Sequence, residues 1–142
     1  MHRKAEARWT GDLKGGKGTV KLGSGAFEGQ YSYSSRFESG SGTNPEELLG
    51  AAHAACYSMA LSLALSTAGH VPTSVTTTAA VHLNKVPDGV AITGIDLVTR
   101  GLVPGVSPGD FQRMAEETRT GCIVSRALSG VPMTLDAKLV SA

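Results

Sequence analysis

Apolar and polar residues alternate at the start of the chain, as they do in half-buried strands. In residues 3–10, the apolar Ala5, Ala7 and Trp9 face one side and charged residues face the other. Residues 17–22 and 30–37 have strand-like composition, and the glycines between these segments favour turns. The pattern therefore predicts an N-terminal antiparallel meander.

A long helix without charge is predicted in the middle of the chain. Asn44 is a favourable N-cap, Pro45 suits the first helical position, and Gly69 ends the helix. No charged residue occurs from position 48 to 68, so the segment must be tested as a membrane span. Its hydroxyl groups, its many alanines and the carboxylates before it argue against a span. We expect a buried central helix, which a dimer would cover better than a single chain of this size.

The second half of the chain alternates between strand and helix patterns. Pro87-Asp88-Gly89 is typical of a hairpin turn, and Ser107 before Pro108 is typical of a helix start. The expected elements are two strands over 75–86 and 90–103, a second helix over 108–121, a short helix over 123–128 and a C-terminal strand over 133–139. The fold class is therefore α+β, in a single domain covering residues 1–142.

Composition narrows the possible partners and cofactors. The net charge is +1 and aromatic residues make up 5%, which argues against a nucleic-acid partner. The start of the chain lacks the apolar segment of a secretory signal, and two cysteines without one fit a reducing cytoplasm. The four histidines have no metal-ligand spacing, so we expect neither a metal nor another cofactor.

The two cysteines are the candidate nucleophiles. Cys56 lies in the apolar helix, where burial disfavours the thiolate, so its reactivity requires a nearby cation. Arg36, expected at the end of the third strand, is the nearest uncommitted basic residue. Cys122 follows Gly121 near a helix start, which favours a thiolate. Either cysteine can also be a small buried core residue, although two are compatible with a redox pair.

Two other residues of the predicted central helix have open roles. His53 precedes Cys56 by three positions and shares its helix face, so the pair could act as base and nucleophile. A buried histidine with a hydrogen bond is the more common arrangement. Glu47 is expected to reach back to Asn44 in a capping box, which leaves Glu46 free for another task.

Several motifs together resemble one known family. They are Ala7–Asp12, Arg36-Phe37-Glu38, the run from Gly42 through Asn44-Pro45-Glu46-Glu47 to Cys56, and Gly121-Cys122-Ile123-Val124-Ser125. The chain resembles the OsmC/Ohr family (osmotically inducible protein C and organic hydroperoxide reductase) from end to end. The Arg-Phe-Glu motif points to the OsmC branch. One departure is Ile123, because family members often have proline after the second cysteine.

The resemblance implies a thiol-dependent peroxidase of peroxiredoxin type that reduces organic hydroperoxides and hydrogen peroxide. It implies Cys56 as the peroxidatic residue and Cys122 as the resolving one. Arg36 and Glu46 match the activating arginine and glutamate of the family. It also implies an intertwined homodimer with active sites at the subunit interface, and an external dithiol as reductant, for which a lipoylated protein is one candidate.

The spacing of two of these residues predicts a shared site. Glu46 and Cys56 are ten positions apart, so on one straight helix they lie about 15 Å apart along the axis. We therefore expect each active site to combine residues of two subunits. Two alternatives remain open: a non-catalytic dimer that binds small hydrophobic molecules, and a hydrolase or acyl transferase that uses Cys56 and His53.

Overall fold

The computed structural model describes residues 1–141. The chain divides into two compact units, one covering Met1–Leu48 and the other starting at Leu49. The fold is α+β, as expected, with two three-stranded sheets and four helices among the described residues. The expectation of one domain over residues 1–142 stays a prediction.

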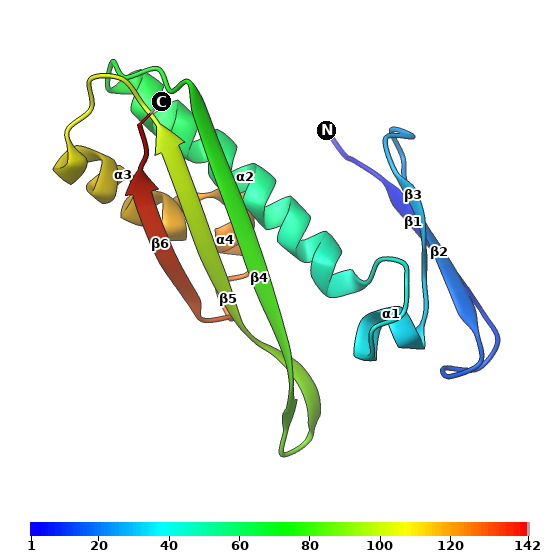
Figure 1. Ribbon diagram of the computed structural model, residues 1–142. Coiled ribbons are helices and arrows are strands. Elements are labelled where there is room, and N and C mark those ends of the chain that lie inside the picture. The colour runs from blue at the N-terminus through cyan, green and yellow to red at the C-terminus, as the bar shows by residue number, and fades with distance from the viewer. Residues whose placement is uncertain (142) are drawn as a thin grey trace. The chain divides into compact units, whose positions relative to one another are not determined.

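The first unit contains the predicted meander. Its strands are β1 (Ala5–Thr10), β2 (Lys17–Leu22) and β3 (Glu28–Tyr31), paired antiparallel in that order (Figure 1). Gly18 pairs with Trp9 on one side and with Tyr31 on the other. A side chain on Gly18 would collide with both aromatic rings, whose centroids are 5.4 Å apart. The close approach of these rings therefore requires glycine at this position.

Two expectations for the first unit are wrong. The predicted half-buried face of residues 3–10 is exposed at Ala5 and Ala7, whereas Trp9 packs against the Tyr31 ring. The third strand was expected to reach residue 37, but it ends at Tyr31 and α1 (Tyr33–Phe37) follows. The cause is a capping box in which Ser32 and Ser35 satisfy each other's backbone N–H groups, which starts a helix.

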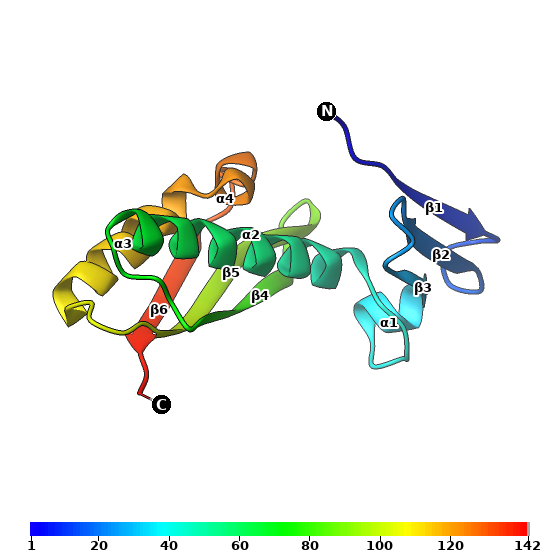
Figure 2. The ribbon, with the colours of Figure 1, turned by 90° about the horizontal axis from the view of Figure 1, so that it is seen from above.

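The second unit is a sheet with helices on one face. Strand β4 (Ser74–Val86) pairs antiparallel with β5 (Gly89–Leu102), and β6 (Met133–Leu139) pairs parallel with β5. Most of α2 (Pro45–Thr67), with α3 (Pro108–Gly121) and α4 (Ile123–Ala127), covers one face of this sheet (Figure 2). The helix ends follow the sequence signals: Ser107 Oγ accepts from the Asp110 N–H, and Gly69 has a φ of +89°.

The core of the second unit forms between α2, the sheet and α3. A stripe of α2 residues one turn apart, His53, Tyr57, Leu61 and Leu65, is fully buried. The opposite side of the helix is open: Met59 is 75% exposed and Leu63 is 69% exposed. The single chain leaves this side of the helix uncovered, as expected for a chain of this size, and its burial in a dimer stays a prediction. By length and composition alone α2 could cross a membrane, but its buried stripe packs as in a core helix.

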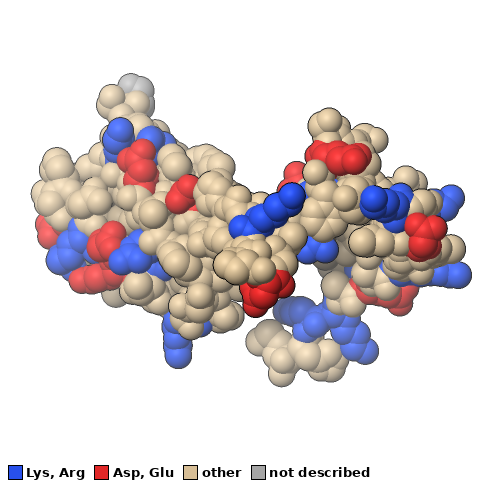
Figure 3. Space-filling model, turned by 90° about the horizontal axis from the view of Figure 1, so that it is seen from below, with Lys and Arg blue, Asp and Glu red and all other residues tan. Residues whose placement is uncertain are grey.

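Charged side chains of both signs lie on the face of the molecule drawn in Figure 3, where Lys and Arg side chains occur beside Asp and Glu side chains over much of the surface. This agrees with the net charge of +1. That nucleic acid is not a partner stays a prediction.

Candidate active site

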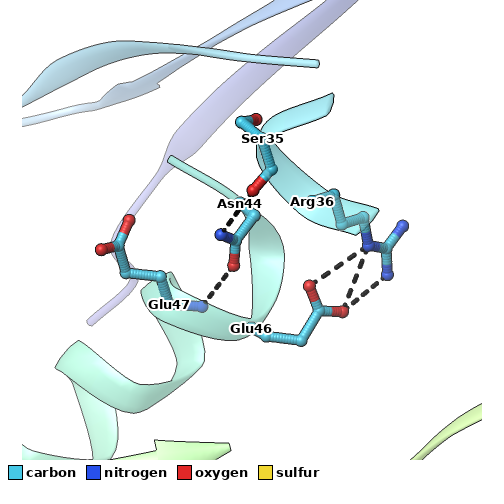
Figure 4. A network of polar contacts seen from close by, with 5 residues as sticks. All are labelled: Ser35, Arg36, Asn44, Glu46 and Glu47. Atoms are coloured by element: carbon cyan, nitrogen blue, oxygen red, sulfur yellow. Dashed lines mark hydrogen bonds and ion pairs between the residues drawn. The ribbon is translucent and has the colours of Figure 1, made fainter. Parts of the chain in front are cut away.

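Arg36 and Glu46 form a two-point ion pair in the first unit (Figure 4). The Arg36 Nε donates to both carboxylate oxygens at 3.2 Å, and Nη2 donates to Oε1 at 2.7 Å. Glu46 is buried, whereas the Arg36 side chain is 37% exposed. The pair therefore fixes the guanidinium by one edge and leaves the rest of it accessible.

Local capping places the two partners. Arg36 lies in the last turn of α1, not at a strand end as expected, because α1 replaces the end of the predicted strand. Glu46 lies in the first turn of α2. Asn44 ties the two helices together, since its Nδ2 donates to the Ser35 carbonyl at 3.1 Å and its Oδ1 accepts from the Glu47 N–H at 2.8 Å.

The expected capping box at the start of α2 is incomplete. The Glu47 carboxylate accepts from Thr43 Oγ1 at 2.7 Å and does not return to Asn44. Glu46 is nevertheless free for another contact, as predicted, and that contact is Arg36.

Both cysteines lie in the second unit as free thiols. Cys56 is half-buried in the middle of α2 and packs against the core cluster that includes Cys122. Cys122 is 2% exposed and is the N-cap of α4, as its position near a helix start predicted. Its Sγ accepts from the Ser125 N–H at 3.3 Å and donates to Ser125 Oγ at 3.0 Å. Ile123 is 77% exposed, so the residue after the second cysteine has little packing role in the single chain.

His53 is hydrogen-bonded to Ser125 and not to Cys56. Its Nε2 lies 2.7 Å from Ser125 Oγ, and the residue is fully buried. Burial lowers the pKa of His53, which keeps the imidazole neutral at pH 7. The structure thus favours the buried, hydrogen-bonded histidine over a Cys56–His53 pair.

Ser125 is the residue that the sequence analysis missed. It contacts both Cys122 and His53, and it lines a pocket of about 260 Å³ together with Arg119, Ser129 and Met133. No local pattern indicates this role, because the cap of α4 uses the Ser125 backbone N–H and not its side chain. Among residues 1–141 no cluster of metal-ligating side chains was found.

The comparisons with known proteins bear on the whole chain. The family model described as "OsmC-like protein" matches residues 38–136. Over 142 residues the chain is 51% identical to "Peroxiredoxin OsmC" of Escherichia coli (strain K12), covering 99% of each protein. It is 32% identical over 92 residues to "Organic hydroperoxide resistance protein" of Xanthomonas axonopodis pv. citri (strain 306), covering 64% of this chain and 63% of that protein.

A solved structure shows the same fold. The crystal structure of the organic hydroperoxide resistance protein OhrB of Bacillus subtilis matches with a TM-score of 0.74 and 22% identity, covering 95% of this chain and 98% of that one. At this identity the likeness concerns the fold alone. The end-to-end sequence match and the family model confirm the resemblance seen in the motifs, and the chain belongs to the OsmC-like family.

Proposed function

We propose that this protein is a cysteine-based peroxidase that reduces organic hydroperoxides, and also hydrogen peroxide. One observation carries the proposal: Cys56 and Cys122 are both free thiols, and Cys56 packs against the core cluster that holds Cys122. The 51% identity to a peroxiredoxin over nearly the full length supports it.

The reaction starts at Cys56. Its thiolate attacks the distal oxygen of the hydroperoxide, so an S–O bond forms, the O–O bond breaks and an alcohol leaves after protonation. The product is a sulfenic acid on Cys56. The Cys122 thiol then condenses with it, which forms the disulfide and releases water. An external dithiol restores both thiols by exchange, and a lipoylated protein is one candidate for that role.

Arg36 and Glu46 are the proposed activating residues. A thiolate in a half-buried position needs a fixed positive charge, and a guanidinium cannot lose its proton. Glu46 accepts hydrogen bonds from Nε and Nη2 on one edge of the Arg36 guanidinium. The other edge is then free to face the thiolate and the peroxide oxygens. Glu46 thus orients the arginine and does not contact the substrate itself.

The proposed site combines two subunits of a homodimer. Glu46 and Cys56 belong to the same helix, ten positions apart, so about 15 Å of helix axis separates them within one chain. An Arg36–Glu46 pair contributed by the other subunit would supply the charge. The open side of α2, with Met59 and Leu63, is a surface that such a dimer would cover. We further propose that the dimer acts in the cytoplasm, where thiols are kept reduced.

A thiol titration tests the function. We expect two thiols per chain to disappear on addition of one equivalent of tert-butyl hydroperoxide and to return on treatment with dithiothreitol. The Cys122→Ser variant should lose its single thiol to a trappable sulfenic acid, and Cys56→Ser should lose none. Unchanged thiols in the wild-type protein would instead favour a binding protein with inert cysteines.

A further inference from the structure

Three buried polar side chains form a continuous hydrogen-bonded chain in the second unit. The Cys122 thiol donates to Ser125 Oγ at 3.0 Å, and Ser125 Oγ lies 2.7 Å from His53 Nε2. Cys122 and Ser125 are each 2% exposed, and His53 is 0% exposed. The path joins a thiol on the helix start of α4 to an imidazole on α2 through a single hydroxyl.

One of the two neutral forms of His53 gives the hydrogen atoms of this path a single direction. A hydroxyl has one hydrogen, so Ser125, when it accepts from Cys122, can donate its own hydrogen to His53 Nε2. That form of the imidazole carries its hydrogen on Nδ1. This Nδ1 is a buried atom for which no hydrogen-bond partner was found among the described residues.

Helix capping does not account for this arrangement. The cap of α4 requires only the Cys122 sulfur and the Ser125 N–H. A buried imidazole with one unpaired nitrogen is unfavourable and calls for an explanation in terms of function.

We propose that Ser125 and His53 form a proton relay that ionises the Cys122 thiol during disulfide formation. The proposal rests on the peroxidase function proposed above. Ser125, which touches the reacting sulfur, is a catalytic residue of this step. His53 acts through Ser125 and is a positioning residue that receives the proton.

The step balances in atoms and electrons. The Cys122 proton moves to Ser125 Oγ while the Ser125 proton moves to His53 Nε2, which gives a thiolate, a hydroxyl and an imidazolium. The thiolate attacks the sulfenic sulfur of Cys56, so the S–S bond forms and the S–O bond breaks. Hydroxide leaves with the bonding electrons and takes the proton back from the imidazolium through Ser125, forming water. The Cys122 sulfur is oxidised and the Cys56 sulfur is reduced.

The resting state of His53 leaves its ring able to accept a proton. Burial lowers the pKa of His53, so the ring is neutral at pH 7, and the imidazolium formed in the step is correspondingly short-lived. The charged residues of α3 near this part of the core are Glu116 and Arg119. Glu116 and Cys122 raise the pKa of the neighbouring Tyr57, and Arg119 lowers it. On its own helix the titratable groups one turn away are Cys56, which would hold the other sulfur of the proposed disulfide, and Tyr57, whose raised pKa keeps the phenol neutral.

The test separates the two chemical steps in the full-length protein. Reduced protein is mixed with one equivalent of tert-butyl hydroperoxide, the sulfenic acid is trapped with a cyclic 1,3-dione, and disulfide formation is followed over time between pH 5 and 9. For His53→Gln and Ser125→Ala we expect the wild-type rate of Cys56 oxidation but disulfide formation about 100-fold slower. The variant rates should rise with pH, whereas the wild-type rate should be constant above pH 7.

The outcomes are distinguishable. Wild-type kinetics in both variants, or slower kinetics with an unchanged pH profile, would overturn the relay, because a purely structural role predicts the latter. His82→Gln, on the exposed side of the sheet, is the matched control and should behave as wild type. Absence of Cys56 oxidation in the wild-type protein would instead refute the proposed function.

A measurement on the wild-type protein avoids any folding defect of the variants. Nitrogen-15 NMR of the reduced protein at pH 7 reports which ring nitrogen of His53 carries the hydrogen. The relay requires the hydrogen on Nδ1 and a bare Nε2. A hydrogen on Nε2 would overturn the proposal.

Discussion

One edge of the Arg36 guanidinium binds the Glu46 carboxylate, with Nε 3.2 Å from both carboxylate oxygens and Nη2 2.7 Å from Oε1. Lysine cannot reproduce this two-point contact, although it keeps the charge. We expect Arg36→Lys to lower kcat/KM for tert-butyl hydroperoxide by about 100-fold, because the proposed role of Arg36 requires a fixed donor facing the peroxide and lysine does not supply one. Arg100→Lys is the matched control, since Arg100 pairs with Asp136 at 3.0 Å on the exposed side of the sheet. Equal effects of the two substitutions would contradict the role of Arg36.

Mixing two inactive variants tests the shared active site. If Arg36 and Cys56 of one site come from different subunits, an Arg36→Ala chain paired with a Cys56→Ser chain contains one intact site. We expect peroxidase activity to reappear after subunit exchange between the two variants. A mixture with no activity, in which mass spectrometry shows that mixed dimers have formed, would place both residues in the same chain.

The Tyr57 hydroxyl links α2 to α3. It donates to the Ala115 carbonyl at 2.8 Å in a fully buried position, and burial together with the charge of Glu116 raises its pKa, so the phenol stays protonated. Tyr57→Phe removes this buried hydrogen bond and should lower the free energy of unfolding by about 0.5–1.5 kcal/mol in chemical denaturation. Tyr33→Phe, in the partly buried α1, should change it by less than about 0.5 kcal/mol.

Gly101 of β5 lies directly against the Phe111 ring of α3. A Cβ atom there would lie 2.6 Å from Phe111 Cε2 and 3.3 Å from Val103 Cγ2, and both neighbours are buried. Gly101→Ala should therefore destabilise the protein by about 1–3 kcal/mol. Gly109, in the first turn of α3, has open space at its Cβ position. Gly109→Ala should stabilise by about 0.4–1 kcal/mol, and a stabilising Gly101→Ala would contradict this packing.

Stability should fall in mild acid because of His53. Its folded pKa lies below the unfolded value near 6.5, so the unfolded chain binds the extra proton first. The stabilisation is therefore complete above about pH 6.5 and is lost as the pH falls toward the folded pKa. One such proton contributes a slope of up to about 1.4 kcal/mol per pH unit. Urea midpoints at pH 7.5 and 5.5 should differ more in the wild-type protein than in His53→Gln, and equal differences would contradict the assignment.

Local signals predicted much of the fold correctly. The helix from Pro45, the α3 start at Ser107 and the strand Met133–Leu139 carry caps or alternation that act within a few residues. The third strand was predicted too long because Ser32 and Ser35 can cap a helix as readily as they can continue a strand. The burial predicted for Ala5 and Ala7 from the alternating pattern was also wrong. Alternation indicates which residues share a face of a strand and not whether another element covers that face.

The sequence by itself determined the family, the two cysteines and the pairing candidates Arg36 and Glu46, because motifs at fixed spacing are independent of packing. Only the tertiary structure decided that the guanidinium binds Glu46 by one edge, and that Cys122 and His53 meet through Ser125. His53 and Ser125 are separated by 72 positions, and no local pattern relates them. Their contact exists because α2 and α4 lie on the same face of one sheet, and burial there leaves polar groups only each other as partners.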